Sequence, residues 1–159
     1  MAELTLPQFL LKNAREHPRR VAMREKEYGI WQEFTWAQYL DHVNAIALGL
    51  SRLGLQRGDK IAIISDNRPQ VYWTMVAAQA CGGVPVPVYQ DAIAKEIQYV
   101  IDHSDARFVL AEDQEQVDKL LGLRQELPKV QKIIYDDPKG MRHYRDPILM
   151  PLTELEALG

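Results

Sequence analysis

The chain has 159 residues, of which 47% are hydrophobic, and its formal net charge is −3 at pH 7. A chain of this length buries roughly two-thirds of its unfolded surface when it folds as one domain. Its 19 Lys and Arg residues are scattered among 22 acids, a pattern that argues against a nucleic-acid partner. The single cysteine, Cys81, excludes an intrachain disulfide framework and favours a reducing compartment.

Membrane and secretion signals are lacking in the sequence. No apolar run approaches the ~20 residues that a helix needs to cross a bilayer. The opening Met-Ala-Glu-Leu does not resemble a signal peptide. We therefore expect a cytoplasmic protein with no transmembrane segment.

The first unit that the pattern predicts is a helix and a hairpin. Residues 4–16 have helical periodicity and end before His17-Pro18. Residues 21–25 and 30–34 flank a polar turn that closes at Gly29, which predicts a β-hairpin. The apolar side chains expected on one face of the helix are Leu6, Phe9, Leu10 and Ala14.

A long amphipathic helix follows the hairpin. Thr35 and Gln38 have the spacing of a capping box, in which each side chain satisfies the backbone N–H of the other residue. Gly54 stands where a left-handed C-cap is needed, and Leu55 can make the accompanying apolar contact. The apolar stripe, which we expect to face the core rather than a partner protein, comprises Trp36, Tyr39, Val43, Ile46, Leu50 and Leu53.

Residues 57–90, RGDKIAIISDNRPQVYWTMVAAQACGGVPVPVYQ, predict a βαβ unit. The β-branched run at 61–64 is typical of a strand that is buried on both faces. Asp66 and Asn67 can cap the next helix, and Pro69 suits its first turn. Gly82-Gly83 favours a helix C-cap over a phosphate loop, because the GxGxxG and GxxxxGK spacings are absent.

The pattern of alternating strands and helices continues to residue 136. Strands are predicted at 60–65, 84–89, 107–111 and 130–135, and helices at 69–81, 93–103 and 113–126. Asp113 and Gln116 are spaced as another capping box. The fold class is therefore α/β: a parallel βαβ sheet with right-handed crossovers, flanked by helices and preceded by the N-terminal helix and hairpin.

The last residues predict little regular structure. Residues 136–140 read as a turn and residues 141–146 as a polar, loose segment. Thr153 and Glu156 are spaced as the capping box of a final helix. A helix that short is marginal unless it packs on something, so it is either docked on this chain or cut from its packing partners. We expect residues 141–159 to be loosely tied to the rest.

Several short sequence segments, taken in order, resemble the N-terminal region of AMP-forming acyl-CoA synthetases, especially long-chain fatty-acid–CoA ligases. The segments that carry this resemblance are RGDKIAIISDNRP, the helix ending ACGG, and VPVPVYQDA. The segments before and after them extend the likeness over most of residues 4–137. The resemblance implies a partial domain of an adenylate-forming enzyme, with residues 1–56 as prelude, 57–136 as βαβ core and 137–159 as truncated tail.

By resemblance, the complete enzyme uses ATP, Mg²⁺ and CoA to convert a fatty acid to acyl-CoA, AMP and pyrophosphate. The Ser/Thr/Gly-rich loop with a lysine that holds ATP phosphates in such ligases is absent from this sequence. We therefore expect this fragment to be inactive, to bind no cofactor or metal itself, and to have no catalytic residue. Peripheral membrane attachment, acyl chain length and oligomeric state stay open for the complete enzyme.

Two expected partners and several alternatives accompany this hypothesis. The remainder of the same polypeptide is the expected partner, and a homodimer is expected through Phe9, Trp31 and the open edges of the sheet. The chain could instead be a stand-alone α/β interaction module without catalysis. It could also belong to a fatty-acyl-AMP ligase or to another carboxylate adenylator.

The best site candidates are the loops that follow the first two strands of the sheet, since ligands gather at the carboxyl ends of strands in open α/β sheets. These loops are Ser65-Asp66-Asn67-Arg68 and Tyr89-Gln90-Asp91. Helix capping and loop packing account for them equally well. His17, His42, His103 and His143 lack the spacing of a zinc helix, and Cys81 reads as a small buried hydrophobe.

Overall fold

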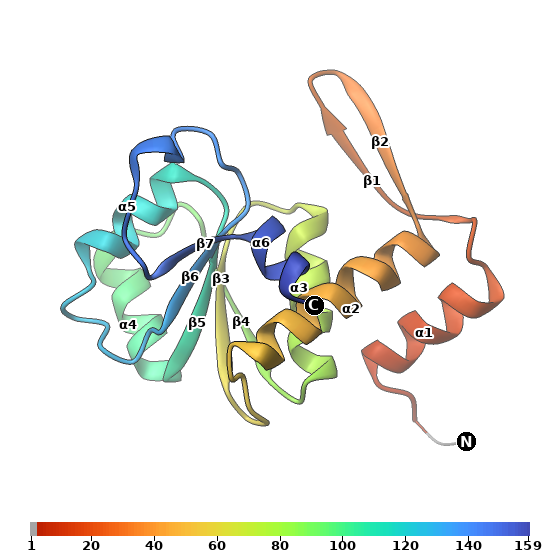
Figure 1. Cartoon of the computed structure of the whole chain (residues 1–159), viewed down its shortest axis with the longest axis horizontal. Helices are drawn as coiled ribbons and strands as arrows, with labels where there is room; N and C mark the ends of the chain where they lie inside the picture. Colours follow the sequence, from red (N-terminus) through yellow and green to blue (C-terminus); the bar gives the residue numbers. More distant parts are fainter. Residues whose placement is uncertain (1–2) are drawn as a thin grey trace.

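The computed structural model describes residues 3–159. Met1 and Ala2 lie outside the described part, and the expectations about a signal peptide and about the 1–56 unit partly rest on them. A five-stranded parallel sheet forms the middle layer, in the order β4-β3-β5-β6-β7 (Figure 1). This parallel sheet confirms the predicted fold class. Its strands are β3 (Lys60–Ile64), β4 (Val84–Val88), β5 (Ala106–Ala111), β6 (Lys132–Tyr135) and β7 (Leu149–Pro151).

Helices cover both faces of the sheet, which explains why its strands are apolar on both sides. On β3, Ile61 and Ile63 face one core cluster, while Ala62 and Ile64 face the other. This alternation follows from the period of two along a strand. The first core is closed by α1 (Leu6–Glu16), α2 (Trp36–Arg52), α3 (Pro69–Ala80) and α6 (Leu152–Leu158), and the second by α4 (Ala94–Ser104) and α5 (Gln114–Gly122).

The N-terminal hairpin comprises β1 (Val21–Glu27) and β2 (Ile30–Thr35), which pair antiparallel and project from the body in Figure 1. Its two-residue turn has positive φ at Tyr28 and Gly29, the backbone shape that fits the twist of paired strands. The Thr35–Gln38 capping box is confirmed. The α1 face is only partly as predicted, because Leu6 and Phe9 are largely exposed while Leu10 and Ala14 are buried.

The glycine caps are confirmed by their backbone bonds. After α2, Gly54 takes φ +90° and the Leu55 N–H donates to the Leu50 carbonyl. After α3, Gly82 takes φ +76° and the Gly83 N–H donates to the Ala78 carbonyl. Both are Schellman motifs, in which orphan carbonyls of the last turn find donors. Gly82-Gly83 therefore ends a helix, as the sequence predicted.

Two predicted details of the helices are wrong. Asp66 and Asn67 do not cap α3: its N-cap is Arg68, whose side chain makes no cap bond. Asn67 instead accepts a hydrogen bond from the Tyr72 hydroxyl. The helix predicted at 113–126 ends at Gly122, because the chain tightens into successive i→i+3 turns that bury Leu127.

The expectation of a loose C-terminal segment is also wrong. β7 pairs in parallel with β6 and adds a fifth strand that the sequence did not predict. α6 lies against α2 (Figure 1), with Leu152 and Leu155 buried in the first core. The proposed Thr153–Glu156 capping box does not form, because the helix begins at Leu152 and Glu156 bonds to His42 of α2.

Proline removes donors from both outer edges of the sheet. On β4 the Val84 N–H points inward to the Asp59 carbonyl, so the alternating residues Pro85 and Pro87 face outward without an N–H. On β7 the Leu149 N–H is taken by Asp146, and Pro151 has none. Edges of this kind resist pairing with another strand. Strand addition therefore does not support the expected homodimer, which stays a prediction.

Gly49 of α2 permits the docking of α6, and its replacement gives a first prediction. A Cβ at residue 49 would overlap the Leu155 carbonyl oxygen. Gly49→Ala should therefore lower the free energy of unfolding by about 1–3 kcal/mol, although alanine is the better helix former. Gly122→Ala, where a Cβ meets nothing within 4 Å, should raise it by up to about 1 kcal/mol. Urea unfolding of both variants decides this, and equal stabilisation by both would show that α6 is not docked on Gly49.

Candidate functional site

The two loops that the sequence singled out meet at the carboxyl edge of the sheet. The turn after β3 and the turn after β4 line one open groove of about 430 Å³, which we call the β4 groove. Its walls combine polar loop atoms with apolar side chains. The lining residues are Ser65, Asp66, Asn67, Val71, Pro87, Val88, Tyr89, Gln90 and Asp91. The structure thus brings Ser65-Asp66-Asn67 together with Tyr89-Gln90-Asp91.

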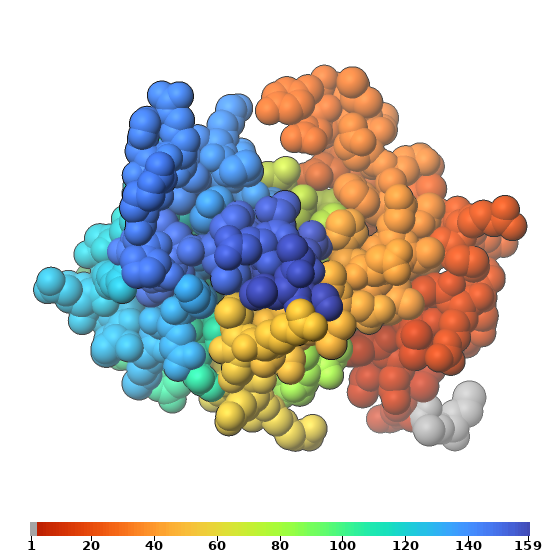
Figure 2. All heavy atoms as spheres, viewed as in Figure 1, coloured from red at the N-terminus to blue at the C-terminus, as the bar shows by residue number. Residues whose placement is uncertain are grey.

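Arg68 belongs to a second and larger cleft, which the sequence did not predict. This hairpin cleft, of about 590 Å³, lies between the hairpin and the chain that follows β6. Figure 2 shows the hairpin and the segment before β7 as two ridges with the cleft between them. Its lining residues are Glu25, Lys26, Glu27, Tyr28, Gln32, Phe34, Arg68, Gln70, Asp136, Asp137 and Pro138.

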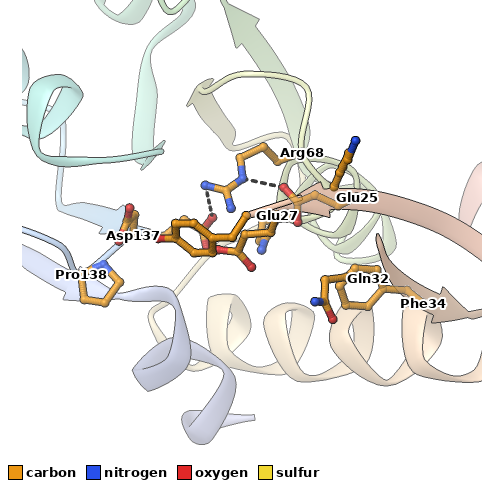
Figure 3. A pocket seen from close by; sticks show the side chains of 11 residues that line it. Glu25, Glu27, Gln32, Phe34, Arg68, Asp137 and Pro138 are labelled. Carbon is orange, nitrogen blue, oxygen red and sulfur yellow. Dashed lines mark hydrogen bonds and ion pairs between the residues drawn. The ribbon is translucent and has the colours of Figure 1, made fainter. Parts of the chain in front are cut away.

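One guanidinium group at the floor of the hairpin cleft faces three carboxylates from three different segments. Arg68 Nε donates to Glu25 Oε1 of β1 at 2.9 Å. Its Nη1 lies 3.6 Å from Glu112 Oε1, just after β5, and 3.7 Å from Asp136 Oδ2, just after β6. Figure 3 shows Arg68 reaching between Glu25 on one wall and the Asp137–Pro138 segment on the other. We call these four residues the Arg68 cluster.

Glu112 ties the cluster to the turn after β3. Its Oε2 accepts hydrogen bonds from the Asp66 N–H at 2.6 Å and from the Ser65 hydroxyl at 3.2 Å. β3 and β5 are neighbours whose following helices pack on opposite faces. Such a topological switch point opens a crevice at the carboxyl ends of the strands. In this protein the crevice is occupied by the Glu112 carboxylate.

Burial raises the pKa of the Asp136 carboxyl from 3.8 to about 6. The Arg68 guanidinium lowers it, but less than desolvation raises it, and the carboxylates of Glu25, Asp137 and Glu112 add to the rise. Burial lowers the pKa of the Arg68 guanidinium, but Glu25, Asp136 and Glu112 together raise it above its usual value. The cluster therefore holds one permanent cation, and one acid changes its charge near neutral pH.

Within residues 3–159, no group of three or more His, Cys, Asp or Glu side chains could hold a metal ion. None of the helices in that range is both long and apolar enough to span a membrane. The Cys81 thiol, whose pKa is raised by burial, donates to the Ala47 carbonyl and lies in a structural position.

The residues that sequence reasoning missed are Glu25, Glu112 and Asp136. Glu112 and Asp136 follow the ends of strands and Glu25 lies within β1, and all three segments were interpreted only for their secondary structure. The available signal was that Glu112 and Asp136 directly follow adjacent parallel strands, whose carboxyl ends share one edge. Glu25 gave no such signal, because nothing local in a hairpin strand indicates which way it folds over the sheet.

Asp136 gives a prediction about pH. Its pKa is higher in the folded than in the unfolded chain, so the native state holds more protons between about pH 4 and 6 and stability falls as pH rises through that interval. Asp136→Asn should remove this loss. Its unfolding free energy relative to the unmodified chain should rise by about 2–3 kcal/mol from pH 4 to pH 8.

The control for this measurement is Asp41→Asn, on the exposed face of α2. It should follow the unmodified chain at both pH values in urea unfolding. An Asp136→Asn difference that does not change with pH would mean that the carboxyl of Asp136 titrates as an ordinary surface acid.

Comparison with known proteins agrees with this architecture. A family profile described as AMP-binding enzyme matches residues 10–147. A long-chain-fatty-acid–CoA ligase from Bos taurus is 29% identical over 139 residues, which cover 87% of this chain and 19% of the relative. The 4-hydroxybutyrate–CoA ligase 2 from Metallosphaera sedula is 34% identical over 105 residues, which cover 66% of this chain and 19% of that enzyme.

A solved structure shares the fold as well. A protein from Rhodopseudomonas palustris assigned as a long-chain-fatty-acid CoA ligase superposes with a TM-score of 0.81 at 26% identity, covering 97% of this chain and 36% of that chain. The present chain spans only about a fifth of the length of the curated relatives given above. Since the profile covers residues 10–147 of 159, the protein belongs to the family of AMP-binding enzymes and matches their N-terminal part.

Proposed function

We propose that this chain is the N-terminal subdomain of an acid–thiol ligase that makes acyl-CoA from a long-chain fatty acid. In the first step the carboxylate would attack the α-phosphorus of ATP, yielding acyl-adenylate and pyrophosphate. In the second step the CoA thiolate would attack the acyl carbon and release AMP. The observation that carries the proposal is the match of 97% of this chain to the structure of the Rhodopseudomonas palustris protein assigned as a long-chain-fatty-acid CoA ligase.

The residues present would serve as a scaffold in that reaction. The sheet, buried on both faces, fixes the loops at its carboxyl edge, which is where α/β folds place ligands. ATP, Mg²⁺ and CoA would be held by residues outside this chain, since the chain has no Ser/Thr/Gly-rich phosphate loop. We further propose a cytoplasmic location, with the rest of the polypeptide as the main partner.

A smaller acid is the second candidate substrate for the same chemistry. The relative from Metallosphaera sedula is named for 4-hydroxybutyrate and is more identical to this chain than the bovine enzyme is, although over a shorter stretch. The apolar side chains of the β4 groove, Val71, Pro87 and Val88, favour an acyl chain over a hydroxy acid. For this reason we propose a fatty acid, rather than 4-hydroxybutyrate, as the first candidate substrate.

Activity assays on the chain alone give the third prediction. Purified protein incubated with ATP, Mg²⁺ and either palmitate or 4-hydroxybutyrate should release no pyrophosphate above a protein-free blank. The physical reason is that the chain has no Ser/Thr/Gly-rich loop to hold the triphosphate, and acids outnumber bases in the lining of the hairpin cleft. A polypeptide that continues into a phosphate loop should release pyrophosphate with one of the two acids.

The outcomes separate the candidates. Protein-dependent acyl-AMP from the 159-residue chain would contradict the scaffold role. Activity of the longer polypeptide with 4-hydroxybutyrate but not palmitate would replace the fatty acid as substrate. A longer reading frame without any phosphate loop would favour the interaction module.

A further inference from the structure

We propose that the Arg68 cluster is a pH-sensitive latch that sets how firmly the β1–β2 hairpin closes over the carboxyl edge of the sheet. The hairpin would be held closed at mildly acidic pH and loosened at neutral to alkaline pH. The opening would widen the hairpin cleft. This inference is independent of the chemistry proposed above, because it concerns only residues of this chain.

The hairpin is attached to the body at few points. At its base Ala22, Met23 and Phe34 pack against the first core, with Phe34 set edge-on to Trp73 at 5.2 Å between ring centroids. At its tip the only bridge given by the described side chains is Lys139, 6.0 Å from the Tyr28 ring. Between base and tip the Glu25–Arg68 ion pair is the direct tie to the sheet.

The exposed side chains of the hairpin show that little else restrains it. Tyr28, Ile30 and Trp31 are 85%, 64% and 61% exposed. The cross-strand pair of Arg24 with Glu33 lies within the hairpin and adds nothing to its docking. A segment with few buried apolar contacts opens at low free-energy cost. The ion pair at Glu25 therefore has unusual influence on the closed state.

Arg68 is shared unequally among its three acids. Only Glu25 is at hydrogen-bonding distance, while Glu112 and Asp136 face the Nη1 side at 3.6 and 3.7 Å. When Asp136 is ionised it attracts the guanidinium away from Glu25 and also repels the Glu25 carboxylate. A proton on Asp136 removes both effects at once. The guanidinium of Arg68 then interacts only with the carboxylates of Glu25 and Glu112. The Glu112 carboxylate already accepts hydrogen bonds from the Asp66 N–H and the Ser65 hydroxyl.

The other charged groups that line the cleft with Asp136 include more acids than bases. From the hairpin come Glu25, Glu27 and Lys26; Asp137 follows Asp136 on its own segment. Excess negative charge in the cleft opposes ionisation of Asp136, and burial does so more strongly, which brings its pKa to about 6. The charge that weakens the latch thus appears within the range in which cells regulate pH.

A distance measurement tests the latch. In a Cys81→Ser background, spin labels on Ile30→Cys and Arg142→Cys report the separation of the hairpin from the segment that faces it across the cleft. Pulsed electron paramagnetic resonance on samples frozen from pH 5 and pH 8 should give a narrow, short distribution at pH 5 and a broader, longer one at pH 8. The ratio of open to closed forms should rise severalfold.

Three variants assign the effect to the named groups. Asp136→Asn should stay closed at both pH values, and Glu25→Gln should be open at both. Asp137→Asn, which removes a carboxylate from the same cleft wall but not from the cluster, should still open between pH 5 and pH 8, with its midpoint at slightly lower pH because Asp137 helps to raise the pKa of Asp136. The Arg68 Nε–H signal in NMR provides a second reading, since it exchanges slowly with water only while it donates to Glu25.

Two results would overturn the proposal. One is a distance distribution of the labelled parent that is the same at pH 5 and pH 8. The other is a pH response that survives in Asp136→Asn. If that variant does not fold, the parent and Asp137→Asn still decide between a pH-dependent latch and a fixed hairpin.

Discussion

The carboxyl edge of the sheet depends on a single guanidinium group. Arg68 stands at the N-terminus of α3, and it reaches acids from the hairpin, from the end of β5 and from the end of β6. No two of these acids are close in sequence. Backbone hydrogen bonds join the end of β5 to the end of β6, and the ion pair with Arg68 brings Glu25 of the hairpin to the same edge. Removing Arg68 would leave several partly buried carboxylates facing one another, a cost far larger than that of an ordinary surface ion pair. The Glu25–Arg68 ion pair thus adds to the packing of Ala22, Met23 and Phe34 in holding the hairpin against the body.

A second constraint acts at the opposite side of the first core, where α6 lies on α2. Gly49 lets the two backbones approach, and Leu155 fills the space above it. Glu156 then bonds to His42 Nδ1 at 2.7 Å, and the His42 ring stacks on Trp73 at 3.8 Å. Since Trp73 also touches Phe34, the last helix and the base of the hairpin pack on the same aromatic pair. The C-terminal segment, short as it is, therefore supports the elements that position the cleft.

The sequence could predict the features that depend on local patterns of residues. Periodicity found the strands and helices of the sheet, and turn chemistry found Gly29, Gly54 and Gly82 with their positive φ angles. It could not find β7, because three residues that include Pro151 have no periodic signal and pair only with a strand already in place. The predicted capping role of Glu156 was wrong for a related reason: its carboxylate bonds to His42, which is distant in sequence, instead of to the nearby backbone. The candidate site was found in part, since its loops were named while the acids that organise Arg68 were not.

The two hollows at the carboxyl edge differ in chemistry although they share a boundary. The β4 groove has Val71, Pro87 and Val88 in its walls, whereas the hairpin cleft is lined mainly by charged and polar side chains. The turn from Asp66 to Arg68 separates them, and Glu112 holds that turn by the Asp66 N–H. Release of the hairpin from Arg68 would leave the bond between Glu112 and the Asp66 N–H intact. Because the turn is fixed by Glu112 and not by Asp136, a proton on Asp136 can change the cleft and leave the groove in place.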